Sequence, residues 1–392
     1  MAITIQHKRD TASNWTSNNP TMSAGEIGVE TDTGKFKFGD GSTAWSSLDY
    51  FETAAPSGPT QGAVQGSTAG FISGGREVFY NVSPSVNLLL NTIQKISFTS
   101  DTNATDQGDL LAGFCAHQGT SSSTHGYQSA GGCGPTAGTS TTISNVIQKF
   151  AMSSAANTTD VGDLTSTQCS PGVPGGAMSQ DNGYYIGGRN SSTVVDSYEK
   201  FPFSSDGNAT DVGDQSQDAQ QQGIHSSSTD AYIAGGTTPI DSPSNFAAQN
   251  ITKFPFSSDA NVTDTGGDLT SNDHRMFASW STDTHGYTAG GRSSPSTYAV
   301  CGFFSNAILK YPFAISSGSA TDVANLTEAS QNAAGMASTT HGYRAGGAPN
   351  NYTPDYSSNV IDKHCFSSGA NSTDVGDLIS SIYIDAAGNN QI

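Results

Sequence analysis

The chain has 392 residues, which is enough for two domains and a sizeable core. Only 12% of the residues are charged, yet there are 45 Gly, 18 Phe and 14 Tyr, a composition that favours an all-β protein of short strands and many turns over a disordered chain. The net charge of −19 repels phosphate backbones, so we do not expect nucleic acid as a partner.

The first nine residues contain no apolar core of signal-peptide length, and no apolar run of membrane-spanning length occurs. We therefore expect no membrane insertion and assembly in the cytoplasm where the chain is made. The cysteines are Cys115, Cys133, Cys169, Cys301 and Cys365. Their number is odd and they lack CxxC spacing, so we expect small buried side chains and neither a disulfide framework nor a zinc site.

Residues 1–51 form a separate unit with the pattern of a β-hairpin. Ile27 and Val29 alternate with polar residues, as do Phe36 and Phe38, and Thr33-Gly34 between them marks a turn. A unit of this size has little room for a core, so we expect it to oligomerise.

Two runs in this unit are distinctive: Gly25-Glu26-Ile27-Gly28-Val29-Glu30-Thr31-Asp32-Thr33-Gly34-Lys35, and Gly39-Asp40-Gly41-Ser42-Thr43-Ala44-Trp45. This stretch resembles the N-terminal domain of phage major tropism determinant proteins. The resemblance implies a trimeric β-prism that attaches tail fibres and other appendages to the virion. The lectin-like domain of that family has no counterpart here. Residues 52–61, rich in Ala, Pro, Ser and Gly, indicate a linker.

Residues 62–392 contain six similar units. In each, a Gly-Gly pair follows a strand-like segment, and the second glycines are Gly75, Gly132, Gly188, Gly236, Gly291 and Gly347. An apolar segment with one lysine comes next, and the lysines are Lys95, Lys149, Lys200, Lys253, Lys310 and Lys363. A third segment follows, with Asn-x-Thr-Asp as its commonest form and Leu usually at its end.

Each unit is preceded by a small apolar stretch, and such residues are needed where strands crowd around an axis. These stretches are 63–65, 113–116, 176–178, 223–224, 276–278 and 335–337. Four strands per unit predict a six-bladed β-propeller. The Gly-Gly pair resembles the kelch repeat, although the kelch tryptophan has no fixed counterpart. Residues 379–392, with Ile382-Tyr383-Ile384, either pair with the first blade or begin a seventh unit; we favour ring closure.

His125, His285 and His341 hold equivalent places in three blades, where the other blades have Asn182, Asp230 and Ala69. Equivalent places are spread around a ring, so we interpret these residues as turn formers and predict neither a metal site nor a catalytic site. Asp101, Asp206 and Asp259 begin loops that could hold calcium, but Asx turns are the preferred interpretation.

The six lysines are expected to pair with acidic residues of the neighbouring fourth strand. The Asn-x-Thr/Ser triplets are interpreted as turn residues and not as glycosylation sites. We predict no catalytic, cofactor or metal residues, and the ligand-binding residues are unknown. The longest candidate binding loops are Arg76 to Thr92, Cys133 to Asn145, Arg292 to Asn306 and Ala348 to Asn359.

Three functions remain open. The first is a trimeric tail fibre or appendage that anchors by its N-terminus to other virion proteins and binds a host glycan or protein. The second is a capsid decoration or head fibre. The third, an enzyme that depolymerises glycans, is disfavoured because a catalytic group would break the repeat, whereas the acidic residues here recur with the blades.

Overall fold

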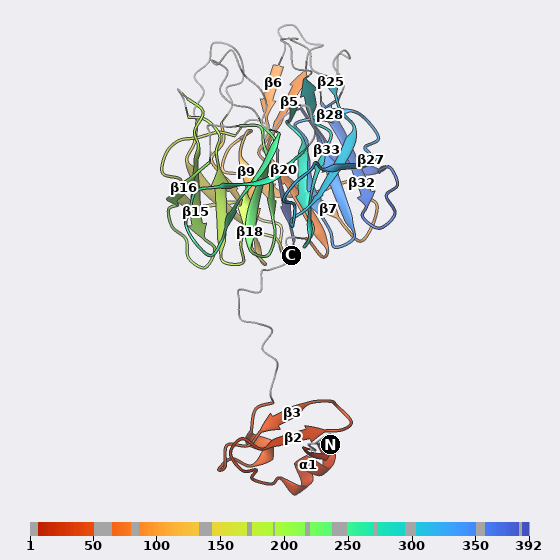
Figure 1. Cartoon of the computed structure of the whole chain (residues 1–392). Coiled ribbons are helices and arrows are strands. Elements are labelled where there is room, and N and C mark those ends of the chain that lie inside the picture. Colours follow the sequence, from red (N-terminus) through yellow and green to blue (C-terminus); the bar gives the residue numbers. More distant parts are fainter. Residues whose placement is uncertain are drawn as a thin grey trace. The chain divides into compact units, whose positions relative to one another are not determined.

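The computed structural model describes residues 7–50, 65–79, 86–132, 143–170, 175–190, 193–215, 220–236, 249–269, 273–294, 303–349, 357–383 and 386–391. The chain divides into two compact units, Met1–Thr60 and Gln61–Ile392 (Figure 1). The segment expected to be a linker lies outside the described residues. None of the described helices is long and apolar enough to cross a membrane.

The first unit holds a three-stranded sheet formed by β1 (Lys8–Asp10), β2 (Ile27–Glu30) and β3 (Phe36–Phe38). The predicted hairpin is confirmed, with Ile27 opposite Phe38 and Val29 opposite Phe36, and β1 runs parallel to β2. A helix, α1 (Ala12–Asn18), was not predicted; it has only seven residues, too few to show a helical period. The Thr11 side chain accepts a hydrogen bond from the Asn14 backbone and begins the helix.

Two tryptophans form the centre of this small unit. Trp15 and Trp45 stack with ring centroids 4.2 Å apart, and Met22 packs against them. A Cβ at Gly28 would lie 2.5 Å from the Trp45 ring, which explains why this position of the motif requires glycine.

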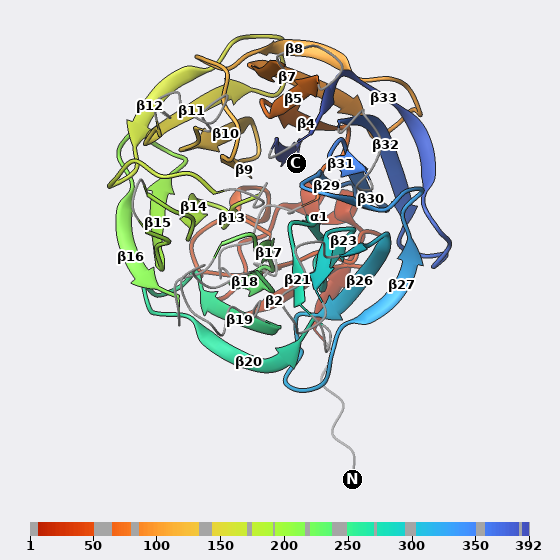
Figure 2. The ribbon, with the colours of Figure 1, turned by 90° about the horizontal axis from the view of Figure 1, so that it is seen from above.

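The second unit contains six four-stranded antiparallel sheets, the blades, which follow one another around a ring in chain order (Figure 2). The all-β prediction with six repeated units is confirmed. From the axis outward, the strands of blades 1 to 3 are β34 (Ala387–Asn390), β4 (Ala69–Ser73), β7 (Thr92–Ser97) and β8 (Thr105–Asp109); β9 (Gln118–Ser121), β10 (His125–Ser129), β11 (Val146–Ala151) and β12 (Thr159–Asp163); and β13 (Ala177–Met178), β14 (Asn182–Ile186), β15 (Ser197–Pro202) and β16 (Thr210–Asp214).

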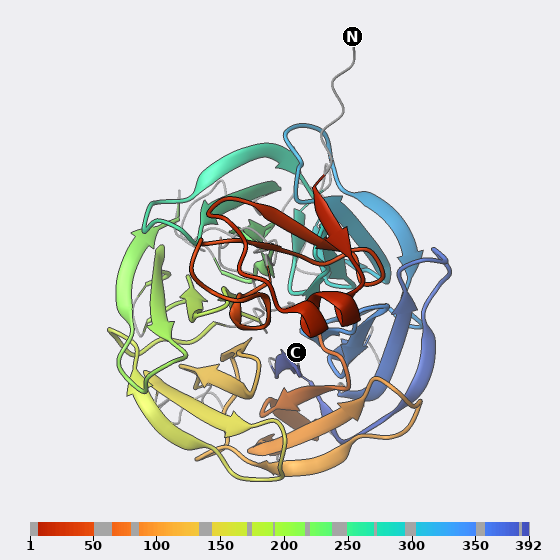
Figure 3. The ribbon, with the colours of Figure 1, turned by 90° about the horizontal axis from the view of Figure 1, so that it is seen from below.

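The other three blades have the same strand order. They consist of β17 (Gly223–Ser226), β18 (Asp230–Ala234), β19 (Asn250–Pro255) and β20 (Thr263–Asp268); β22 (Ala278–Ser281), β23 (His285–Ala289), β26 (Ala307–Pro312) and β27 (Thr321–Asn325); and β29 (Ala334–Ala337), β30 (His341–Ala345), β32 (Ser358–Cys365) and β33 (Thr373–Ile382). Figure 3 shows the same ring from the opposite side, with the fourth strands at the perimeter.

The C-terminal strand closes the ring. β34 pairs antiparallel with β4, with Ala387 opposite Ser73, and so supplies the innermost strand of blade 1. The favoured closure is confirmed, but two details were wrong. The innermost strand of blade 1 was expected at 63–65, and closure was expected through Ile382-Tyr383-Ile384; instead, Ile382 ends β33 of blade 6. Closure by β34 leaves no free inner edge on β4.

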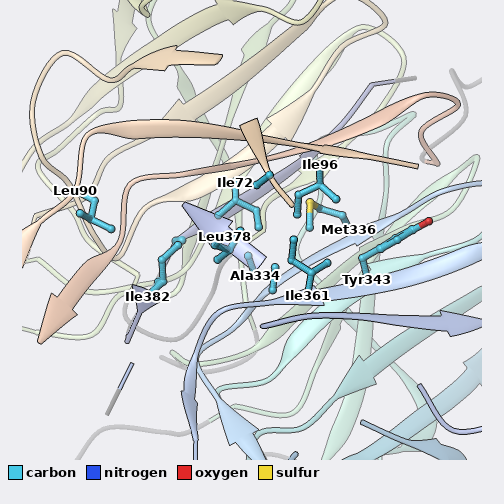
Figure 4. Close-up of a cluster of buried hydrophobic side chains, with 12 residues drawn as sticks. Ile72, Leu90, Ile96, Ala334, Met336, Tyr343, Ile361, Leu378 and Ile382 are labelled. Atoms are coloured by element: carbon cyan, nitrogen blue, oxygen red, sulfur yellow. The ribbon is translucent and has the colours of Figure 1, made fainter. Parts of the chain in front are cut away.

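The hydrophobic core is divided among the blade interfaces. Each of six clusters of buried side chains joins two successive blades. Figure 4 shows the cluster at the closing interface, where Ile72 and Ile96 of blade 1 pack against Met336, Tyr343 and Ile361 of blade 6. A single blade therefore cannot bury its own apolar surface, which is the property expected of a repeat protein.

Aromatic pairs cross five of these interfaces. A tyrosine on the second strand of one blade lies against the phenylalanine that follows the third strand of the next. The pairs, with centroid distances, are Tyr127–Phe203 (4.8 Å), Tyr184–Phe256 (5.2 Å), Tyr232–Phe313 (4.5 Å), Tyr287–Phe366 (5.1 Å) and, across the closing interface, Tyr343–Phe98 (4.6 Å).

The Asn-x-Thr/Ser triplets link the outer rims of the blades. The Asn208 side chain of blade 3 accepts a hydrogen bond from the Asp163 backbone of blade 2, and the Ala209 backbone donates to the Asp163 carbonyl. The same asparagine contact recurs at Asn103, Asn157, Asn261 and Asn371. The triplets therefore serve the joints between blades.

Candidate functional site

The ring presents two chemically different faces. The second strands end and the third strands begin at one face, where the extra strands β5 (Arg76–Phe79), β6 (Val86–Leu89) and β25 (Phe303–Phe304) also lie, as Figure 1 shows. We call this the loop face. The turns between first and second strands, and between third and fourth strands, lie on the opposite turn face. The chain ends of the unit also lie at the turn face, where Gly66 bonds to Ala337 and Ser67 to Gln391. The loop face is thus free of both ends.

The Gly-Gly pairs are the points where the loops of the loop face begin. Gly290, the first glycine of the blade 5 pair, has φ +70°, and a Cβ there would lie 2.6 Å from the Ser330 carbonyl oxygen. The close neighbour is the segment that leads into the next blade, and Gly74 and Gly235 have similar backbone neighbours. Glycine is required here both by backbone angle and by space.

Blade 2 departs from this rule, and the position expected for its Gly-Gly pair from the sequence was wrong by one residue. The residue after its second strand is Ala130, which has φ +63° and donates its N–H to Val146, as Gly74 does to Thr92. The structural equivalents of the pair are therefore Ala130 and Gly131, and Gly132 is one residue further along. The shift was hidden in the sequence because Ala-Gly-Gly offers two possible alignments.

The four loops predicted as binding candidates are described only in part. The hairpin β5–β6 lies within Arg76 to Thr92, and the Arg76 guanidinium lies over the Tyr383 ring at 5.4 Å. β24 (Arg292–Ser294) and β25 lie within Arg292 to Asn306. The centres of all four loops, including 133–142 and 350–356, lie outside the described residues.

The histidines of the repeat lie on the turn face in three different blades. The His125 backbone donates to Ser122 Oγ, and His125 Nδ1 lies 2.8 Å from Thr124 Oγ1. His285 and His341 make the same contacts with their own turns. Burial is the main cause that lowers the pKa of each of the three imidazoles. The geometry is that of a turn stabilised by a hydroxyl side chain.

The prediction for the repeat lysines was wrong. Three of them pair with an aspartate in the turn of the following blade and not with the fourth strand of their own blade. The pairs are Lys149–Asp206 (2.5 Å), Lys200–Asp259 (2.7 Å) and, across the closing interface, Lys363–Asp101 (2.7 Å). The reason is the register, since Thr159 and Thr210 stand opposite Lys149 and Lys200 on the fourth strand.

These pairs also account for the aspartates considered as calcium ligands. Asp101, Asp206 and Asp259 are the aspartates that receive the lysines. The other turn aspartates bond locally; for example, Asp160 Oδ1 accepts from the Gly162 backbone. Within the described ranges, no group of three or more His, Cys, Asp or Glu side chains is placed to hold a metal ion.

Buried polar side chains on the third strands escaped the sequence analysis. Glu199 is fully buried, and its carboxylate accepts hydrogen bonds from the Thr165 backbone (2.7 Å) and from Gln168 (2.5 Å). The same hydrogen bond recurs in three other blades. Gln94 accepts from the backbone of Ile379, and Gln148 accepts from the backbone of Leu111. Asp362 accepts from the backbone and the hydroxyl of Thr327. Each side chain therefore links the end of one blade to the third strand of the next blade. Their recurrence in the lysine-containing segment was the available signal.

Blade 6 adds a buried ion pair to this arrangement. Arg344 and Asp362 are both fully buried, and Arg344 Nη2 lies 3.1 Å from Asp362 Oδ2 and 3.1 Å from Glu328 Oε1. Burial raises the pKa of Asp362 despite the opposing effect of the guanidinium. Because Asp362 also bonds to Thr327, as Glu199 does to Thr165, we assign this cluster to the joint between blades 5 and 6.

The first unit has a groove of about 340 Å³ between β1 and α1. Its lining includes Lys8 and Arg9 from the strand and Asn14 and Trp15 from the helix. Lys8 also forms an ion pair with Glu26 at 2.8 Å, which lowers the pKa of Glu26. The groove is a candidate attachment site.

Together these features define an all-β protein in which a small mixed sheet with one helix precedes a closed ring of six four-stranded blades. A family model described as the major tropism determinant N-terminal domain matches residues 5–43. The match supports a phage protein of the tail-fibre type that takes part in host tropism and is associated with the virion. No curated protein matches the chain.

Proposed function

We propose that this protein is a non-enzymatic phage tail fibre or appendage that anchors to the virion by residues 1–51 and binds the host surface through the loop face. The observation that carries the proposal is the family match over residues 5–43, which covers the whole sheet and helix of the first unit. The loop face supports the proposed binding to the host surface, because long loops on a regular scaffold are a usual arrangement for binding.

A homotrimer is part of the proposal. The first unit has a buried core of Trp15, Met22 and Trp45, which is small for an independent domain. Association of three copies would bury further surface and would bring three rings to one attachment point. Several weak contacts with the host surface would then act together.

Two other functions compete with the tail-fibre proposal. A capsid decoration or head fibre would use the same two units at another place on the virion. A glycan depolymerase would use the loop face as an active site, and new reducing ends after incubation with host polysaccharide would support it.

Competition for host cells tests the proposed function directly. Purified full-length protein should bind host cells and should slow adsorption of the phage that carries it. A protein that neither binds the cells nor slows adsorption would contradict a role in host attachment. Binding without effect on adsorption would favour the capsid location.

A further inference from the structure

One blade lacks the leucine that ends the other repeat units. In five blades this leucine is at most 4% exposed, and the positions are Leu110, Leu164, Leu269, Leu326 and Leu378. Blade 3 has Gln215 in this place, 7% exposed. The Gln215 N–H donates to the carbonyl oxygen of Asp196, the residue before the third strand, and four of the five leucines make the same bond. A polar side chain therefore occupies a core position of the repeat.

Gln215 belongs to a group of three buried glutamines, which we call the glutamine cluster. Gln222 Nε2 donates to Gln215 Oε1 at 2.7 Å, and Gln220 lies two residues before Gln222 in the chain. Gln220 and Gln222 are each 4% exposed. Three amide atoms of the cluster are buried without a hydrogen-bond partner: Gln215 Nε2, Gln220 Oε1 and Gln222 Oε1. The cluster thus leaves two acceptor atoms and one donor atom unused.

The glutamine cluster lies at the loop-face end of the joint between blades 3 and 4. Gln222 directly precedes β17, the innermost strand of blade 4, which begins at this face. Gly236 follows the second strand of the same blade, and a Cβ there would lie 2.3 Å from Gln222 Cγ. The cluster therefore borders the residue at which a loop of the loop face begins.

Folding alone gives no reason for the paired amides of Gln215 and Gln222. The joint between blades 5 and 6 has the same spacing, with Leu326 and Ala333 in these two places. A buried amide group without a hydrogen bond destabilises a fold, whereas leucine and alanine bury no polar side-chain atom. A local departure from a repeated pattern that lowers stability is typical of a functional site.

The unused amide atoms select a ligand by its hydrogen-bonding groups. Within the described ranges, no charged side chain forms a hydrogen bond with the cluster. A carboxylate or sulfate group only accepts hydrogen bonds and would leave Gln220 Oε1 and Gln222 Oε1 unsatisfied, whereas a cation would leave Gln215 Nε2 unsatisfied. A hydroxyl group both donates and accepts, so it matches both kinds of atom.

We propose that the glutamine cluster binds a neutral sugar residue through its hydroxyl groups. Neighbouring hydroxyl groups of one sugar ring offer donors to the two amide oxygens and an acceptor to the amide nitrogen. Because the amide atoms are buried, a ligand without these hydroxyl groups would leave them unpaired, which makes the site specific. The proposal rests on the proposed role in host binding and specifies its ligand class.

Direct binding to matched saccharides is the experiment. Full-length protein is titrated with the methyl glycosides of glucose, galactose, mannose and N-acetylglucosamine, with their fully O-methylated forms, and with glucuronic acid. At least one free sugar should bind. Its O-methylated form, which keeps the ring but donates no hydrogen bond from oxygen, should bind at least about tenfold more weakly. Glucuronic acid should bind no more tightly than the neutral sugar.

The double variant Gln215→Leu, Gln222→Ala gives this joint the residues of the joint between blades 5 and 6, and it leaves neither glutamine without the other. It should weaken sugar binding about tenfold or more. Without sugar, its melting temperature should equal or exceed that of the wild type, because buried unpaired amides are removed. The matched control Leu326→Gln, Ala333→Gln should melt below the wild type and bind the sugar unchanged.

Three results would overturn the proposal. If no free sugar binds, or if the double variant binds as the wild type does, the unused amide atoms bond to ordered water only. If free and O-methylated sugars bind equally, hydroxyl groups are not recognised. If the double variant melts below the wild type, the glutamines serve folding and not a ligand.

Host-cell binding separates this inference from the proposed function. If the wild type and the double variant bind cells equally well, the glutamine cluster is not the contact but the attachment role stands. If the wild type binds the sugar but not the cells, the cluster is a site and the attachment role fails.

Discussion

The left-handed backbone at the start of each loop shows how one residue position can be used differently in equivalent blades. Ala130 and Gly290 both have positive φ after the second strand. Ala130 fits there with its methyl group buried in the cluster between blades 2 and 3, whereas a Cβ at Gly290 would lie 2.6 Å from a backbone oxygen. Exchange between alanine and glycine should therefore change stability little at position 130 and strongly at position 290.

We predict that Ala130→Gly changes the free energy of unfolding by less than about 1 kcal/mol, because relief of left-handed strain is offset by the lost methyl group and by a more flexible unfolded chain. Gly290→Ala should destabilise the protein by about 2 kcal/mol or more, since strain and steric conflict add. Chemical denaturation of both variants measures this. Effects of equal size would contradict the steric conflict assigned to position 290.

Contacts between residues of different strands or blades could not be predicted from the sequence. The lysine and aspartate of each ion pair were both recognised, yet they were paired within a blade because the sequence shows the repeat and not the contact between repeats. Arg275 and Arg292 are separated in the chain by the hairpin of β22 and β23, and their cross-strand register became visible only with the short sheet of β21 (Asp273–Arg275), β24 and β25. Pairing between distant strands is not encoded in local pattern.

The closing strand is the element on which the ring depends most. Asn389 of β34 donates to the Thr120 carbonyl at 2.6 Å and accepts from Gln128 at 2.5 Å, so it joins blade 1 to blade 2 from the axis. Both contacts are buried. At the outer rim, by contrast, Asn371 makes an exposed contact with the Asn325 backbone at 3.0 Å.

We predict that Asn389→Ala lowers the free energy of unfolding by about 2–3 kcal/mol, because it leaves buried polar partners unsatisfied. Asn371→Ala should lower it by about 1 kcal/mol or less, since water can replace the exposed contact. Denaturant titration of the two variants provides the comparison. A larger effect at Asn371 would assign ring stability to the rim and not to the axis.

Removal of the whole strand should have a larger effect. A chain that ends after residue 385 would leave β4 paired with β7 alone and would remove the strand that lies beside Met336. We predict loss of the cooperative thermal transition of the ring, with partial recovery when a peptide of residues 386–392 is added. A truncated chain that melts as the wild type does would exclude closure by β34.

Element types were largely predictable because each strand carries its own pattern, whereas element partners were not. The six units, the second to fourth strands of each blade and the hairpin of the first unit all followed from alternation and turn residues. The innermost strand of blade 1 was misplaced because its sequence, Ala387-Gly388-Asn389-Asn390, has no strand-like alternation. It becomes a strand through pairing with β4 and burial at the axis.

Over the whole ring, buried neutral histidines make stability depend on pH. His225 is fully buried between blades 4 and 5, where its Nε2 lies 2.8 Å from the Tyr287 carbonyl oxygen and its Nδ1 lies 2.9 Å from the Tyr311 hydroxyl. His117 is equally buried beside the Ser73 carbonyl. Burial lowers the pKa of each imidazole to about 4.

The unfolded chain binds protons at these histidines below a pKa of about 6.5, while the folded chain does not do so until about pH 4. Above pH 6.5 the buried histidines do not reduce the free energy of unfolding. As the pH falls towards 4, each of them lowers the free energy of unfolding by about 3 kcal/mol. Compared with wild type, His225→Gln should lose less stability between pH 7 and pH 4.5 in denaturant titrations. Parallel pH profiles would contradict a neutral buried His225.

The oligomeric state belongs to the same scale. We predict that full-length protein in solution has about three times the 40.3 kDa mass of one chain, measured by light scattering after size-exclusion chromatography. Removal of residues 1–51 should return the mass to that of a single ring, because trimer formation is assigned to the first unit. A full-length monomer would remove the trimer from the proposal.

Cryo-electron microscopy of the virion that carries this protein tests the central claim most directly. We expect density for residues 7–50 against other virion proteins and a six-bladed ring with its loop face turned outward from the particle. A particle in which the protein is absent, or in which the loops of the ring contact the virion, would contradict it.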